Sequence, residues 1–263
     1  MACFIFSSSY ADNRLKCDCN LTYGTKKTPG KSCFDILMKT SERCLNDGIY
    51  WISLHLNKST KNAFPVFCDI KTGGYTMVFK IVSGGNQLTS ISKFWKQTSP
   101  SHESTLEALN KSKSFIGLYK NRMVNPTNWK KVKPSEVRFV LYKDGLEQFV
   151  LKFNSKHSSY MNWFTKNNLV QSPWHNIKSS TFNYLTNEGP CWRGRCRDFH
   201  INHKYGGCPK DDGWLSIGNS IECPWETRFP GTSFICRKIG RHQNYNEYSS
   251  FSRDSDVLAI FVR

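Results

Sequence analysis

The sequence predicts a β-rich α+β fold that is held together by disulfide bonds. Apolar runs alternate with polar residues and end repeatedly at Gly, Asn or Asp, which is typical of strands and their turns. With 263 residues, of which 38% are hydrophobic and 14% aromatic, the chain can bury a sizeable core. Eleven cysteines exceed what a reducing compartment favours, and their spacing does not form the paired Cys-x-x-Cys ligands of a zinc site.

The first 32 residues are polar and are interrupted by Gly and Pro. Within them, CDCNLTYG (residues 17–24) resembles the end of an EGF-like module, in which a Cys-x-Cys pair precedes an aromatic residue and a glycine turn. We interpret residues 1–32 as an EGF-like remnant or a linker. Their first apolar run, Cys3–Phe6, is shorter than the hydrophobic region of a signal peptide, about 7–15 residues, so we expect a truncated or internal start.

The next segments predict a helix followed by three strands. Ser32 stands in the N-cap position of SCFDILMKTSERC, whose apolar residues have near-helical spacing. An Asp-Gly turn then leads into DGIYWISL (47–54), and FPVFCDI (64–70) and GGYTMVFKIV (73–82) supply two further strands. Because glycine tolerates positive φ, we expect Gly73 and Gly74 to form the turn between these last two strands.

This hairpin is expected to be a rigid foundation without catalytic residues. Its buried side chains should include Val66, Met77, Phe79 and Ile81. Lys71 and Lys80 should face the solvent. EVRFVLYKDG (136–145) and FVLKFN (149–154) are expected to build a larger sheet, on which dispersed Lys and Arg residues provide affinity for a ligand.

The order of these segments resembles the N-terminal part of fibrinogen C-terminal-like domains and of intelectins. Its motifs are a cysteine before a helix, then D-G-x-Y-W-I, F-P-V-x-C-D and G-G-x-T-x-V-F. The resemblance implies a disulfide between Cys33 and Cys68. We therefore expect a fibrinogen-like domain over residues 33–263, with a small subdomain at 33–83 and a family-specific part with a larger mixed antiparallel sheet at 84–263. The family's calcium loop is missing, because CPKDDGW (208–214) offers only two adjacent carboxylates.

Other cysteine pairs are suggested by spacing. A bridge from Cys208 to Cys223 would close a loop that stabilises the fold by about 3 kcal/mol in the chain-entropy model. Cys191 and Cys196 bracket a tight loop suited to a hairpin bridge, although Cys236 could pair with either of them. The cysteines left unassigned are Cys3, Cys17, Cys19, Cys44 and Cys236. Because the total of eleven cysteines is odd, we expect at least one partner upstream or in another chain.

Three Asn-x-Ser/Thr triplets, at Asn20, Asn57 and Asn110, are candidate glycosylation sites and agree with a secreted glycoprotein.

The sequence holds no catalytic motif that we can identify, and we expect neither enzymatic activity nor a cofactor or metal. His200 and His203 lie near several cysteines, but residues three apart on a strand face opposite sides. A serine elbow, a phosphate-binding glycine loop and a His-Glu metal helix are all missing from the sequence. The eight tryptophans are expected mainly in the core, with two or three exposed at most, where they could stack on sugars.

The chain is strongly basic, with 37 Lys and Arg against 20 Asp and Glu, a formal charge of +17. Such a charge attracts polyanions at low salt. The basic residues are dispersed, with only short runs such as NWKKVKP (128–134), and no nucleic-acid-binding motif accompanies them. We interpret them as a solvated surface and expect acidic partners other than nucleic acid. Every apolar run is too short to span a membrane.

From about Cys17 onward the chain resembles the uncharacterized skeletal organic matrix proteins of stony corals, type 5. The segments that carry this resemblance include VFKIVSGG, LYKNRMVNPTNW, NWFTKNNLVQSPW, YGGCPKDDGWL and DVLAIFVR. It implies a secreted, non-catalytic component of the organic matrix in a biomineral. Acidic matrix proteins, polysaccharides or mineral-associated anions would then be its partners. The alternative is a fibrinogen-related lectin that recognises surface glycans.

Overall fold

A computed structural model gives the fold and describes residues 22–55, 60–85, 90–175, 177–179, 184–192, 195–218, 223–227 and 231–263. Most of the proposed EGF-like remnant lies outside these residues. Within them, no helix has both the length and the apolar character needed to cross a membrane.

The helices and strands follow one another as a β-rich α+β arrangement. The helices are α1 (Cys33–Lys39), α2 (Ile91–Lys96), α3 (Pro126–Val132) and α4 (Pro224–Thr227). The first strands are β1 (Gly48–Ile52), β2 (Phe64–Asp69), β3 (Tyr75–Val82), β4 (Tyr119–Lys120), β5 (Glu136–Lys143), β6 (Leu146–Asn154) and β7 (Leu169–Gln171). The later ones are β8 (Tyr184–Trp192), β9 (Arg195–Lys204), β10 (Asp212–Gly218), β11 (Ser233–Arg237), β12 (Gln243–Asn244), β13 (Phe251–Ser252) and β14 (Val257–Val262). The predicted fold class is confirmed.

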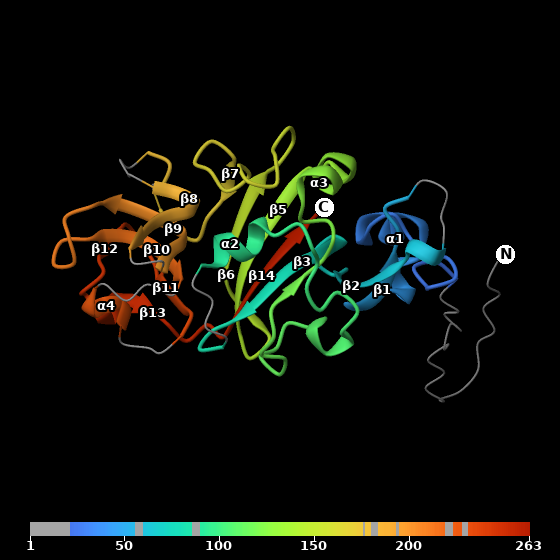
Figure 1. The fold of residues 1–263 in the computed structure, drawn as a ribbon, viewed down its shortest axis with the longest axis horizontal. Coiled ribbons are helices and arrows are strands. Elements are labelled where there is room, and N and C mark those ends of the chain that lie inside the picture. Colours follow the sequence, from blue (N-terminus) through green and yellow to red (C-terminus); the bar gives the residue numbers. More distant parts are fainter. Residues whose placement is uncertain are drawn as a thin grey trace, which may run out of the picture.

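The larger of the two antiparallel sheets forms the centre of the molecule (Figure 1). Its strand order is β1-β2-β3-β14-β5-β6-β7, and β4 pairs with β3. The C-terminal strand β14 lies between β3 and β5 and pairs with both. The predicted hairpin and the predicted strands at 136–154 therefore belong to one sheet, which the end of the chain completes.

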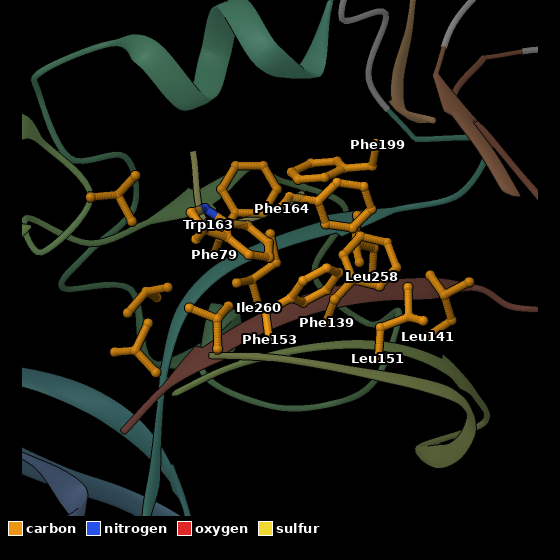
Figure 2. Close-up of a cluster of buried hydrophobic side chains, with 14 of the residues drawn as sticks. Phe79, Phe139, Leu141, Leu151, Phe153, Trp163, Phe164, Phe199, Leu258 and Ile260 are labelled. Atoms are coloured by element: carbon orange, nitrogen blue, oxygen red, sulfur yellow. The ribbon is translucent and has the colours of Figure 1, made fainter. Parts of the chain in front are cut away.

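Aromatic side chains cover one face of this sheet. Phe139 on β5, Phe153 on β6 and Ile260 on β14 lie beneath Trp163 and Phe164, and all of them are buried (Figure 2). The rings of Phe153 and Phe164 are 4.8 Å apart between centroids. Each fully buried aromatic side chain contributes about 1.5–3 kcal/mol of hydrophobic stabilisation, so this cluster accounts for much of the core.

The smaller sheet packs beside the first one. Its strand order is β13-β11-β10-β9-β8, with β12 paired to β10. Phe199 on β9 reaches into the aromatic cluster, where its ring centroid is 5.3 Å from those of both Phe139 and Phe164. The buried carboxylate of Asp198 accepts a hydrogen bond of 2.6 Å from the backbone N–H of Ile91, at the start of α2. The two sheets thus share one core.

The hairpin between β2 and β3 turns at Gly73 and Gly74, as predicted. Cys68 pairs with Thr76 across the hairpin. The φ angles of the two glycines are 121° and 75°, a region that side chains disfavour. The turn also lies against α1, because a Cβ at Gly74 would come within 2.9 Å of Phe34 Cα.

The expectation that Lys80 faces the solvent is wrong. Its side chain is fully buried, and Nζ donates to Ala108 O at 3.3 Å and to Asn110 Oδ1 at 2.9 Å. The segment that contains Ala108 and Asn110 covers the second face of the sheet, so β3 has no solvent side. Continuous apolar strands are typical of sheets covered on both faces. Lys71 is exposed and the four expected core residues of the hairpin are buried.

Candidate anion-binding surface

Helix α3 buries one aromatic ring and exposes its lysines. It begins at Asn125, whose side chain accepts a hydrogen bond of 2.8 Å from a backbone N–H of the first turn. Trp129 is 2% exposed and packs edge-on against Trp95, with 6.4 Å between ring centroids. Lys130 and Lys131 follow Trp129 in the chain and project into solvent. The buried ring therefore fixes the orientation of a helix whose other side is basic.

The end of α3 adds another lysine to this side. Lys133 adopts the left-handed conformation, with φ of 48°, and its N–H donates to Trp129 O at 2.9 Å. Pro134 follows and cannot continue the helical hydrogen bonding, so the chain leaves the helix for β5.

Two cavities adjoin α3, and basic side chains line both. We call these side chains the α3 basic surface: Lys31, His55, Lys130, Lys131, Lys133, Lys156 and His157. All of them are exposed. The smaller cavity has about 200 Å³, and the larger has about 680 Å³. The larger one lies between the end of α3 and residues 155–159.

Among the described residues, the side chains of the α3 basic surface form no ion pairs. Neither cavity is lined by Asp or Glu, and none of the seven basic side chains forms an ion pair with a described residue. Other basic residues differ: Lys39 lies 2.6 Å from Asp35, and Lys111 lies 3.1 Å from Asp47. Uncompensated charge of one sign beside concave, low-dielectric walls raises the local concentration of anions.

Disulfides join Cys33 to Cys68, Cys191 to Cys196 and Cys208 to Cys223. The first bridge ties the start of α1 to β2 across a Cα–Cα distance of 5.4 Å. The second links paired residues of β8 and β9, and the third connects the segment before β10 to the start of α4. Each of the three therefore joins two segments of the chain covalently.

Cys236 on β11 is a free thiol and is buried. It therefore does not compete for Cys191 or Cys196 in this structure. Burial raises the pKa of the Cys236 thiol well above its ordinary value. Cys44 is disulfide-bonded. Cys3, Cys17 and Cys19 lie outside the described residues.

Of the three glycosylation candidates, Asn20 and Asn57 lie outside the described residues. Asn110 is half-buried, and its Nδ2 donates to Glu107 O at 2.8 Å while its Oδ1 accepts from Lys80. A glycan would replace one hydrogen of this amide, so it would have to coexist with these contacts. Glycosylation of Asn110 stays a prediction.

The residues weighed for chemistry do not converge. His200 is buried beside Tyr245, whereas His203 stacks on His242 at 3.6 Å between centroids. The carboxylate of Asp211 accepts from Arg197 at 3.1 Å, and the carboxylate of Asp212, the next residue, pairs with the ring of His242. Within the part of the chain that is described, no group of three His, Cys, Asp or Glu residues could hold a metal ion.

Tryptophan side chains serve mainly as core in this fold. Trp95, Trp129, Trp163, Trp174, Trp214 and Trp225 are buried. Trp51 is partly exposed and lies under the ammonium group of Lys26, 5.2 Å from the ring centroid. The structure does not describe the Trp192 side chain. A platform of exposed rings for sugar stacking is not formed by the described tryptophans.

The lysines of the run NWKKVKP were expected from the sequence to be ordinary solvated surface. Lys31, His55, Lys156 and His157 were not predicted, because they come from distant segments and meet α3 only in the folded chain. The three lysines of the run were a usable signal, because they lie beside a tryptophan that must be buried.

Comparison with known proteins gives a partial family match. The model of the fibrillar collagen C-terminal domain matches residues 17–128, less than half of the chain. No curated protein matches significantly. Among solved structures, the fibrinogen-like globe domain of human ANGPTL6 is similar, with a TM-score of 0.40 and 10% identity over 89% of this chain and 95% of that chain. The family match indicates an extracellular, matrix-related and non-catalytic role.

Proposed function

We propose that this protein is a secreted, non-catalytic component of an extracellular organic matrix and that it binds acidic polymers there. The observation that carries the proposal is the α3 basic surface, with seven basic side chains around two cavities and no carboxylate in the lining of either. The resemblance to coral skeletal matrix proteins suggests a biomineral as the setting. Acidic matrix proteins, polysaccharides and mineral-associated anions are the candidate partners.

Three further features support this proposal. The formal charge of +17 favours association with polyanions of any kind. The match to a fibrillar collagen C-terminal domain supports a place in the extracellular matrix. The disulfides agree with an oxidising environment. The lectin alternative lacks comparable support, because the tryptophans that would favour it are mostly buried.

Salt-gradient elution from a sulfated-polysaccharide column tests the proposal. Retention should be largely lost by about 1 M salt, where the Debye length falls to about 3 Å, and chelation of calcium should change it little. A variant with Lys130→Gln, Lys131→Gln and Lys133→Gln should elute at clearly lower salt than the wild type.

The matched control removes three exposed lysines from the smaller-sheet part of the molecule, by Lys204→Gln, Lys210→Gln and Lys238→Gln. Both triple variants lose the same formal charge. If affinity depends on the α3 basic surface, the control elutes closer to the wild type. Equal shifts for both variants would contradict a localised surface, and retention that depends on calcium but not on salt would favour a lectin.

A further inference from the structure

The larger cavity beside α3 has a defined volume and two walls of known composition. Its volume of about 680 Å³ lies within the range of about 300–1,000 Å³ typical of small-molecule sites. One wall comes from Trp129, Lys130 and Lys133 at the end of α3. The other comes from Lys156, His157 and the serines at positions 155, 158 and 159.

Hydrogen bonds hold the two walls in place. Ser155 is buried, and its Oγ donates to Pro134 O at 2.6 Å, which ties the second wall to the residue that follows α3. The N–H of Ser155 donates to Ser135 O at 3.0 Å. At the other end of the loop, Tyr160 O accepts from the indole N–H of Trp95 at 2.8 Å. A ligand would therefore meet a cavity that needs little rearrangement, which lowers the entropic cost of binding.

The cavity carries positive potential without a protein anion to neutralise it. Lys130, Lys133 and Lys156 contribute three formal charges, and none of them has an ion-pair partner among the described residues. Two polar atoms of the wall, Trp129 Nε1 and Ser158 Oγ, are buried and have no described hydrogen-bond partner.

The shape and chemistry of the cavity narrow the class of ligand. A flat mineral face cannot enter a concave site. The aliphatic stems of the exposed lysines provide apolar contact, and their ammonium groups reach solvent at the rim. A sugar ring has an apolar C–H face and polar edges, and a sulfate or carboxylate substituent on it would supply the negative charge. An acidic peptide offers the charge but little of the apolar face.

We propose that this cavity binds one anionic sugar residue, bearing sulfate or carboxylate, of an acidic polysaccharide. This subsite rests on the proposed function, because the sugar residue would belong to an acidic polymer that the α3 basic surface binds. It adds to that surface a defined subsite, in which the lysine stems contact the sugar ring and the ammonium groups attract its anionic substituent.

Isothermal titration calorimetry with short probes at 0.15 M salt tests this subsite. The probes are a sulfated disaccharide, a uronate disaccharide without sulfate, a neutral disaccharide, sodium sulfate and a hexa-aspartate peptide. Lys133→Gln with Lys156→Gln alters the larger cavity. The matched control, Lys31→Gln with Lys131→Gln, removes the same charge from the smaller cavity.

We expect an anionic disaccharide to bind more tightly than the neutral disaccharide, the peptide or sulfate. The larger-cavity variant should lose roughly tenfold in affinity, as expected for lost charge-assisted hydrogen bonds, and the control should stay within about twofold of the wild type. Binding of the sulfated probe alone would assign the substituent as sulfate, and binding of both anionic disaccharides would assign the site to either substituent.

Three results would overturn the subsite: no binding of either anionic disaccharide, equal or tighter binding of sulfate or the peptide, or equal losses in the two variants. If the column still retains the protein when the disaccharides fail, the proposed function stands without the subsite. If disaccharides bind but the polymer does not retain the protein, the proposed function fails instead.

Discussion

Arg138 on β5 donates from Nη1 to Asp69 Oδ2 at 3.1 Å, although β3 and β14 separate their two strands in the sheet. Both side chains are buried, at 3% and 0% exposure. The guanidinium also donates to Thr72 Oγ1 at 2.7 Å and to Glu147 Oε1 at 2.8 Å, and it lies over the ring of Tyr75. This ion pair therefore connects the hairpin segment to the strands that the second half of the chain supplies.

Removing one partner of this ion pair should be strongly destabilising. Asp69→Ala leaves the buried Arg138 charge without its deepest partner, and we expect a loss of about 3–5 kcal/mol in the free energy of unfolding. Urea denaturation of the variant and of the wild type measures this loss of stability. Glu147→Gln is the matched control, because Glu147 lies nearer the solvent and should cost about 1 kcal/mol or less. Similar losses for the two variants would contradict a special role for Asp69.

Gly74 should tolerate substitution less well than Gly73. Both have positive φ, so alanine at either position costs about 1–3 kcal/mol in backbone strain. A Cβ at Gly74 also meets the backbone of Phe34, whereas one at Gly73 meets the end of the flexible Arg263 side chain. Thermal unfolding of the two alanine variants should show the lower Tm for Gly74→Ala, and the reverse order would refute the packing argument.

Acid should destabilise the fold through His200. Burial, and then the nearby charge of Arg197, lower the pKa of His200 to about 3. The unfolded chain takes up a proton on this residue below about pH 6.5, and the folded chain does not, so stability falls as the pH decreases from about 6.5 to about 3. Urea denaturation across this range should give a shallower pH dependence for His200→Gln than for the wild type. His157→Gln, at an exposed position, should match the wild type; identical curves for all three would exclude this mechanism.

Mild alkali should stabilise the fold through two buried lysines. Burial lowers the pKa of Lys80 and of Lys120 to about 8. Between about pH 8 and 10 the unfolded chain keeps protons that the folded chain has lost, so the free energy of unfolding rises with pH. Lys80→Met and Lys120→Met should each reduce this rise. The assay should stop near pH 10, because burial raises the pKa of Tyr75 and Tyr119 and reverses the trend above it. A flat wild-type profile would rule the effect out.

Cys236 should be inert in the folded protein. Its thiol is 1% exposed and burial raises its pKa, so little thiolate is available to react. Non-reducing mass spectrometry after treatment with iodoacetamide should find Cys236 unmodified in native protein and alkylated after denaturation. Rapid labelling of native protein, or release of several of the paired cysteines, would contradict the structure.

Much of the fold could be predicted because its signals are local. Ser32 caps α1 through a hydrogen bond to the backbone N–H of Asp35, and this geometry involves only four successive residues. The turn at Gly73 and Gly74 needs positive φ, which glycine alone adopts without strain. The strands at 136–154 were visible from apolar residues beside an Asp-Gly turn, and they pair as β5 and β6.

The candidate site was visible only in part. The run NWKKVKP places three lysines next to a tryptophan, and all four residues lie in α3 or at its C-terminal end. The other residues of the α3 basic surface come from segments about 25 to 100 positions away, so no local pattern could place them there.

The sequence by itself determined the strands at residues 47–82 and 136–154, where the first helix begins and where the hairpin turns, because those choices depend on backbone preferences of neighbouring residues. The strands of the smaller sheet were not predicted. Tertiary structure decided which faces are covered. Lys80 is buried because Ala108 and Asn110 fold over its strand, and a hydrogen bond from Ser155 to Pro134 joins the two walls of the cavity beside α3. The burial of a side chain and the electrostatic potential around it depend on all the atoms within a few ångströms. In this chain many of those atoms belong to residues that are distant in sequence.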